Sequence, residues 1–148
     1  KKALTSRSFE KWPALDQRLW HAATQKGEFL DPDGKAAHWS DATRIQFEKG
    51  YSKWIFHLEA GGVLPGRGND APMERVDEDQ LRAYLKRLNQ QGLGSQSIAS
   101  RITDLAEAIR VMQPQADTII LNHLAITMQQ RATPSRRKQA RIKPPQEI

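Results

Sequence analysis

One stretch of the chain, residues 95–112, has the clearest helical periodicity in the sequence. Its apolar side chains recur at alternating steps of four and three, which is the spacing of one face of an α-helix. They are Ile98, Ile102, Leu105, Ile109 and Met112. Either Ser95 or Ser97 can serve as the N-cap after Gly92-Leu93-Gly94, and Pro114 stops the helix. We therefore expect a helix from Ser95 to Met112 with one buried face.

The opposite face of the first two turns is small, polar and free of carboxylates. It carries Gln96, Ser97 and Ser100, with Arg101 beside the apolar stripe. Such a helix can enter the major groove of DNA, where glutamine pairs with adenine, serine with either type of base and arginine with guanine. The alternative is a plain amphipathic helix of a bundle, because such helices are the commonest kind.

Four further apolar stripes predict helices, and no segment has the period of two that is typical of a strand. A short helix after Pro13 is expected to bury Trp12, Leu15, Leu19 and Ala22, and longer helices are expected over residues 40–60, 77–91 and 116–130. The segment 63–76 has no period and is expected to be a loop. The sequence therefore predicts an all-α fold, with four core helices and a fifth near the C-terminus.

The composition favours a polyanionic partner. The chain of 148 residues has a net charge of +6, and residues 131–148 alone carry +5. That segment contains prolines and no apolar period, so we expect a basic linker. The expected division is a flexible basic N-terminus (1–11), a helical domain (12–130) and the linker (131–148). No apolar run is long enough to span a membrane and no secretory signal is present, so we expect a cytoplasmic protein.

No catalytic or metal-binding motif stands out in the sequence. The absence of cysteine excludes disulfides, a thiol nucleophile and zinc-finger ligand sets. The four histidines form no His-x-x-His or His-x-x-x-His pair, so we expect surface or helix-face residues rather than ligands, and no metal or cofactor. Tyr51 and Tyr84 lie on apolar stripes and are expected in the core.

Four patches of the sequence, in order, point to a family. They are His38–Thr43 before a long helix, the acidic start and Tyr-Leu-x-x-Leu of Val76–Leu88, Gly92–Ile98, and the basic, proline-flanked Arg131–Lys143. Over residues 12–145 the chain resembles the N-terminal core-binding, SAM-like domain of tyrosine recombinases (phage integrases), in the Cre branch. Gly92–Ile98 is similar to the family's Gly-Leu-Ser-x-x-Thr-Ile, with Ser97 where threonine is usual.

The resemblance implies that this domain is one half of a clamp on duplex DNA. In that family the helices corresponding to residues 40–60 and 95–112 enter the major groove, and the fifth helix packs against neighbouring protomers. Catalysis belongs to a second domain with a His-x-x-Arg motif, and no histidine here precedes an arginine by three positions. We therefore expect a fragment of a site-specific recombinase that does not itself cleave DNA.

The candidate DNA contacts come from the resemblance and from helix faces. By position the resemblance implies Thr43, Gln46, Gln96, Ser97, Ser100 and Arg101. Three groups of cations are candidates for phosphate contacts: lysines on the same helix face as Gln46, cations on the outer face of the helix over 77–91, and cations of the linker. They are Lys49, Lys53, Arg82, Lys86, Arg136, Arg137, Lys138, Arg141 and Lys143. Two features depart from the family: the loop over 63–76 is long, and Asp104 is expected on the outer face of its helix, where a phosphate would repel it.

Two other classes of function remain open. One is a helix-turn-helix regulator with residues 95–112 as its recognition helix. The other is a helical protein-interaction module whose basic tail only solubilises it. Binding to duplex DNA with a steep salt dependence separates both DNA-binding functions from the last.

Overall fold

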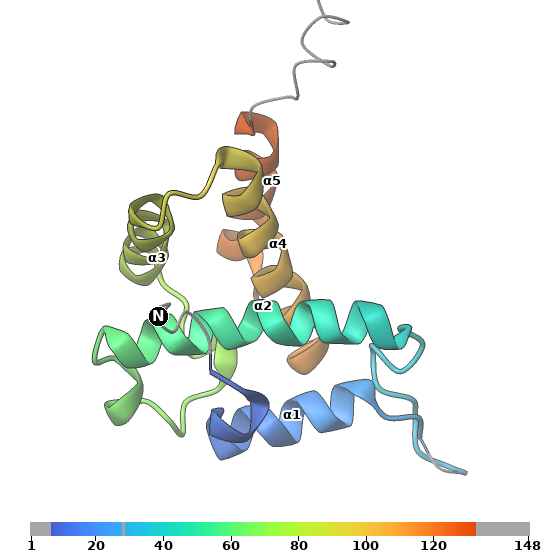
Figure 1. Ribbon diagram of the computed structural model, residues 1–148. Coiled ribbons are helices and arrows are strands. Elements are labelled where there is room, and N and C mark those ends of the chain that lie inside the picture. Colours follow the sequence, from blue (N-terminus) through green and yellow to red (C-terminus); the bar gives the residue numbers. More distant parts are fainter. Residues whose placement is uncertain (1–6, 28, 133–148) are drawn as a thin grey trace, which may run out of the picture.

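All regular elements in the described part of the chain, residues 7–27 and 29–132, are helical. The computed structural model (Figure 1) contains α1 (Ala14–Thr24), α2 (Asp41–Ala60), α3 (Glu78–Gln90), α4 (Ser95–Met112) and α5 (Ile119–Arg131). Short 3-10 helices cover Phe9–Lys11, Leu64–Gly66 and Pro72–Arg75. The predicted all-α class is therefore confirmed.

The helix ends follow from local capping, with two differences from the expectation. Ser40 caps α2 by accepting a hydrogen bond from the Thr43 amide, and Asp77 caps α3 in the same way. Gly94, without a side-chain cap, occupies the N-cap of α4 in place of the expected serines. The helix α5 begins at Ile119 rather than at residue 116, because Gln113–Ala116 forms a turn and the Asp117 side chain accepts from the Ile119 amide.

The helix α4 is central to the fold and is packed against the other four. Its predicted stripe is buried, with Ile102, Leu105 and Ile109 fully covered. In Figure 1, α5 runs beside α4, α2 crosses α4, and α1 runs below α2, where it also packs on α4. The helix α3 is viewed nearly along its axis while α4 lies in the plane of the view, so the two helices joined by Gly92-Leu93-Gly94 are strongly inclined to each other.

The buried face of α1 differs from the predicted stripe. Asp16, Trp20 and Ala23 are buried, whereas Ala22 is exposed and Leu15 and Leu19 are only half-buried. The expectation is wrong by a rotation of about one residue, because the pattern search counted only apolar side chains and this helix buries a carboxylate.

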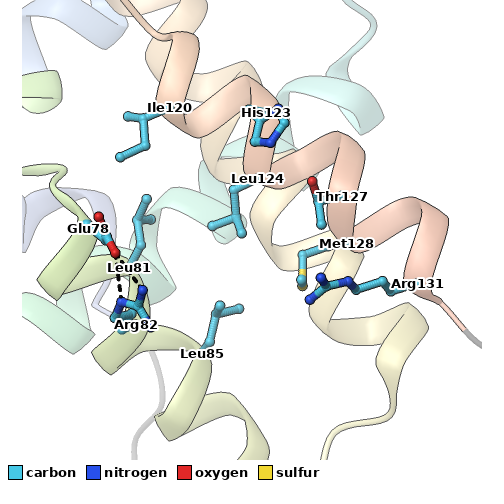
Figure 2. A pocket seen from close by; sticks show the side chains of 10 residues that line it. All are labelled: Glu78, Leu81, Arg82, Leu85, Ile120, His123, Leu124, Thr127, Met128 and Arg131. Carbon is cyan, nitrogen blue, oxygen red and sulfur yellow. Dashed lines mark hydrogen bonds and ion pairs between the residues drawn. The ribbon is translucent and has the colours of Figure 1, made fainter.

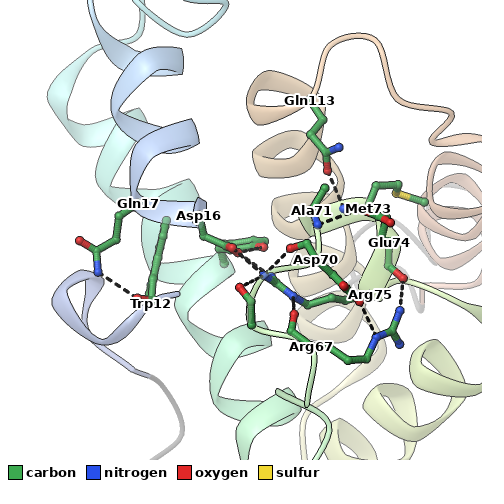
Figure 3. Close-up of polar contacts among 12 residues, drawn as sticks. Trp12, Asp16, Gln17, Arg67, Asp70, Ala71, Met73, Glu74, Arg75 and Gln113 are labelled. Atoms are coloured by element: carbon green, nitrogen blue, oxygen red, sulfur yellow. Dashed lines mark hydrogen bonds and ion pairs between the residues drawn. The ribbon is translucent and has the colours of Figure 1, made fainter. Parts of the chain in front are cut away.

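That carboxylate belongs to a buried polar network (Figure 3). Asp16 accepts hydrogen bonds from Arg75 Nη1 at 2.7 Å, from Arg75 Nη2 at 2.8 Å and from the Tyr51 hydroxyl at 2.5 Å. The same guanidinium donates to the carbonyl oxygens of Arg67, Gly68 and Asp70. The segment 63–76, expected to be a loop, is thus folded around Arg75 and tied to α1 and α2.

Part of the N-terminus expected to be flexible is packed. Phe9 packs against Trp12, with the two rings tilted and their centroids 4.9 Å apart. The Arg7 guanidinium lies over the Phe56 ring and pairs with Glu59. Residues 1–6 and the expected linker over 133–148 lie outside the described residues.

Candidate nucleic-acid interface

The helices α2 and α4 cross at Gly50 and Asp104. A Cβ atom at Gly50 would lie 2.4 Å from the Cβ of Asp104, so this close approach requires glycine. Asp104 is only 8% exposed and accepts a hydrogen bond of 3.2 Å from Gln46 Nε2. The expectation that Asp104 lies on the outer face of its helix is therefore wrong. Burial raises the pKa of its carboxyl, and the bond from Gln46 and the charges of Arg101 and Lys53 oppose that shift.

Three cations surround this crossing. Lys49 and Lys53 of α2 and Arg101 of α4 are close enough for their charges to act on one another. Burial lowers the pKa of Lys53, and the charges of Arg101 and Lys49 lower it further, whereas the carboxylate of Asp104 opposes the shift. Among the described residues none of the three forms an ion pair with a carboxylate. The fold thus holds three cations beside the buried carboxylate of Asp104, and a further anion would stabilise the excess positive charge.

The candidate serines extend this surface along α4. Ser97 and Ser100 are exposed and share one side of the helix with Arg101 and Asp104, because their spacings are three, four and seven residues. We call this surface the α2/α4 face, defined by Lys49, Lys53, Ser97, Ser100 and Arg101. The structure therefore brings together five of the candidate DNA contacts.

Three other candidates lie near the α2/α4 face. Thr43 takes part in the N-cap of α2, where its hydroxyl lies 3.0 Å from the Ser40 hydroxyl. Gln46 is exposed, but its amide nitrogen is bonded to Asp104. Gln96 is exposed on the neighbouring strip of α4. Thr43 and Gln46 are thus held by neighbours within the protein.

The candidates on α3 lie elsewhere. Arg82 is exposed, pairs with Glu78 and lines a groove between α3 and α5 (Figure 2). Lys86 lines a different hollow, beside His57 and Gly61. The cation of α3 that approaches the α2/α4 face is Arg87, which lines one small cavity with Lys53 and Arg101. The sequence contained a signal for it, since Arg87 adjoins the stripe of Leu88 as Arg101 adjoins that of Ile102.

Arg87 is held by a buried histidine. Its Nε donates a hydrogen bond of 2.8 Å to Nδ1 of His57, which is 4% exposed. Burial lowers the pKa of His57 to about 4, and the charge of Arg87 acts in the same direction, whereas a hydrogen bond with the Gln80 backbone opposes it. His57 is therefore a neutral acceptor, and of the two expected places, the surface or a helix face, it occupies a buried face of α2.

The groove between α3 and α5 has apolar walls. Leu81 and Leu85 of α3 face Leu124 and Met128 of α5 across a volume of about 370 Å³ (Figure 2). Of the stripe expected on α5, only Leu121 is fully buried, while Ile120 is 42% exposed. Ile119 and Ile126 are also exposed. This side of the molecule therefore presents apolar surface, in contrast to the α2/α4 face.

The described residues contain no metal cluster and no membrane-spanning helix. Within residues 7–27 and 29–132, no three histidine, aspartate or glutamate side chains gather in a way that would hold a metal ion. Across the same ranges, none of the helices combines the length and hydropathy needed to cross a membrane.

The environment of the two tyrosines agrees with the sequence. Tyr51 and Tyr84 are buried, as predicted, and burial raises the pKa of each hydroxyl.

The linker cations Arg136, Arg137, Lys138, Arg141 and Lys143 lie outside the described residues. No protein-family model, curated protein or solved structure matches the chain, so the site is interpreted from its own residues.

Proposed function

We propose that this chain is a helical domain that binds duplex DNA through the α2/α4 face. The observation that carries the proposal is the gathering of Lys49, Lys53 and Arg101 around the crossing of α2 and α4, where the charge of the buried Asp104 also acts on Lys53 and Arg101. Phosphate oxygens supply the negative charge that this surface lacks, and such contacts position a protein on the duplex.

The polar part of the face suits base edges. Ser97 and Ser100 are short, so the first turns of α4 can approach a groove closely, and their hydroxyls donate and accept hydrogen bonds. Asp104 does not oppose this approach, because it is buried against Gly50 and bonded to Gln46. In this proposal the cations bind the phosphate backbone of the DNA while the first turns of α4 contact the bases.

The resemblance to core-binding domains supports a more specific proposal. In it, this domain is one half of the clamp that a site-specific tyrosine recombinase closes around its DNA site. The exposed Ile119 and Ile126 of α5 would contact a neighbouring copy in the full-length protein. The linker cations would add phosphate contacts that do not depend on base sequence.

A salt titration with matched variants tests DNA binding. We expect the chain to bind a random duplex with a log–log salt slope near about −4 to −5, corresponding to about four to six phosphates. Replacing Lys49, Lys53 and Arg101 with alanine should reduce the magnitude of that slope by about one for each lost phosphate contact. The control replaces Arg18 of α1, Lys35 before α2 and Arg110, which lies on the side of α4 opposite Arg101, and all three are exposed.

The control variant removes the same charge, so it should bind almost as well as the wild type. Equal losses in the two variants would mean that net charge alone attracts DNA and would reject the α2/α4 face. Binding that does not depend on salt would reject the DNA-binding function and favour a protein-interaction module.

A further inference from the structure

A small cavity opens between α2, α3 and α4 beside the α2/α4 face. Its volume is about 30 Å³, and its lining includes Lys53, Tyr84, Arg87, Gln91 and Arg101. The three cations come from three different helices, and each is half-buried. Three positive charges therefore converge on one cavity.

The cavity wall includes a buried hydroxyl without a partner. Tyr84 is 1% exposed, and its Oη is among the few buried polar side-chain atoms of the described residues that have no hydrogen-bond partner. The ring is held by Trp54 and His57, with centroids 5.1 and 5.0 Å away. The charges of Arg101 and Asp104 both act on this hydroxyl, which therefore lies toward α4. Burial raises its pKa, so it remains a protonated donor.

An unpartnered donor in this position is informative, because leaving a buried hydroxyl unsatisfied costs free energy and native proteins rarely do so. The acceptor that fits must also be anionic, given the cations of the wall. Arg87 also has donors to offer. Its Nε donates to the neutral His57, which uses one of the five N–H groups of the guanidinium.

We propose that this cavity is a phosphate-binding socket in which Tyr84 donates to a phosphate oxygen while Lys53, Arg87 and Arg101 balance its charge. A cavity of about 30 Å³ accepts about two or three oxygen-sized atoms, since one water needs about 10–15 Å³. It is too small for a base or a sugar. This inference rests on the proposed function in that the phosphate is taken to belong to the DNA backbone. Free inorganic phosphate has the same chemistry and is the other possible source.

The socket changes the role expected for Arg101. The sequence predicts a contact with guanine, whereas an arginine in the socket wall holds the backbone. Replacing Arg101 with alanine should therefore weaken binding to all duplex sequences alike, and Ser97 and Ser100 remain for base contacts.

The test compares Tyr84→Phe with Tyr51→Phe in the whole chain. Each variant loses one buried hydroxyl, but that of Tyr51 is bonded to Asp16. We measure affinity for a random duplex by fluorescence anisotropy, affinity for inorganic phosphate by amide NMR shifts against chloride at equal ionic strength, and thermal stability. Tyr84→Phe should lower the affinity for one or both ligands about tenfold, the effect of losing a hydrogen bond to a charged group, without lowering the melting temperature. Tyr51→Phe should lower the melting temperature and leave both affinities unchanged.

Arg87→Gln is the second variant, and it should also weaken binding of the ligand that the socket takes. If both variants bind phosphate and DNA like the wild type while Lys49→Ala weakens DNA binding, the socket is rejected and the proposed function stands. If DNA does not bind but phosphate binding depends on Tyr84, the socket stands and takes free phosphate, whereas the proposed function fails. If Tyr84→Phe lowers the melting temperature and changes neither affinity, the hydroxyl has a structural role and the socket is rejected.

Discussion

At the scale of single residues, the buried Asp16 determines how three segments pack. Its carboxylate neutralises Arg75, and both side chains are fully buried. A buried ion pair need not add stability relative to an apolar pair, but removal of one partner leaves an uncompensated charge in a medium of low polarity. The arrangement of α1, α2 and the segment 63–76 therefore depends on both charges.

We predict that Asp16→Asn lowers the free energy of unfolding by about 3–5 kcal/mol. The substitution keeps the size of the side chain, removes the charge that balances Arg75 and replaces one acceptor oxygen with an amide nitrogen that cannot accept from Arg75 or Tyr51. Urea denaturation measures the loss. The control is Glu78→Gln, which removes the carboxylate of the exposed pair with Arg82 and should leave the unfolding midpoint unchanged. A midpoint shift of equal size in both variants would contradict the account.

His57 should make stability depend on pH. Its pKa is about 4 in the folded chain, below the value of 6.5 that an unfolded chain gives it. Between pH 6.5 and 4 the unfolded state takes up a proton that the folded state does not, so stability is complete above this window and falls as the pH falls. The decrease approaches about 1.4 kcal/mol per pH unit in the middle of the window.

The matched variant is His57→Asn, whose side-chain oxygen can still accept from Arg87 but does not titrate. Urea midpoints at pH 7 and pH 4.5 should differ less in this variant than in the wild type. Carboxylates affect both proteins equally, so the difference between them isolates His57. An identical pH dependence in the two proteins would show that the histidine does not titrate as described.

At the scale of elements, the crossing of α2 and α4 positions the candidate site. We predict that Gly50→Ala destabilises the protein by about 1–3 kcal/mol through overpacking, although alanine is better than glycine in a helix by about 1 kcal/mol. The new Cβ would meet the Cβ of Asp104, a backbone-anchored atom that cannot move aside. Gly66→Ala is the control, since no atom lies within 4 Å of its Cβ position. An unchanged or raised melting temperature for Gly50→Ala would reject this close crossing.

Strong apolar stripes made most elements predictable. The helix α4 has the bounds that its stripe indicated, because five apolar side chains at helical spacing leave little choice of face. The face of α1 was mispredicted, since a buried aspartate is recognisable only with Arg75, which lies 59 residues later in the chain. The folded structure of segment 63–76 also depends on the pair of Asp16 and Arg75, and such a pair leaves no periodic pattern in the sequence.

The candidate site was predictable only in part, for a geometric reason. Helical spacing placed Lys49 with Lys53, and Ser97 with Ser100, because each pair lies on one helix. Whether these two surfaces lie side by side depends on the position at which α2 crosses α4. The apolar pattern of one helix does not specify that position. For the same reason the sequence selected Arg82 and Lys86 on α3, while the fold brings Arg87 to the site.

At the scale of the whole molecule, the charged and apolar surfaces lie on different sides of α4. Gln129 of α5 donates to Thr103 on one side of this helix, and Arg101 lies on the opposite side. The central helix thus separates the α2/α4 face from the apolar groove between α3 and α5. One molecule of this design can hold DNA on one side and a neighbouring copy on the other, which is the arrangement that we propose.

The most direct test of the central claim is to map a bound duplex onto the chain by amide NMR chemical shifts. We predict that the largest shift changes occur on the α2/α4 face, at Lys49, Lys53, Ser97, Ser100 and Arg101, and that the groove between α3 and α5 is unaffected. Raising the salt concentration should reverse these changes together, because the same phosphate contacts cause them. Shift changes confined to residues 131–148, or centred on the α3/α5 groove, would contradict the account.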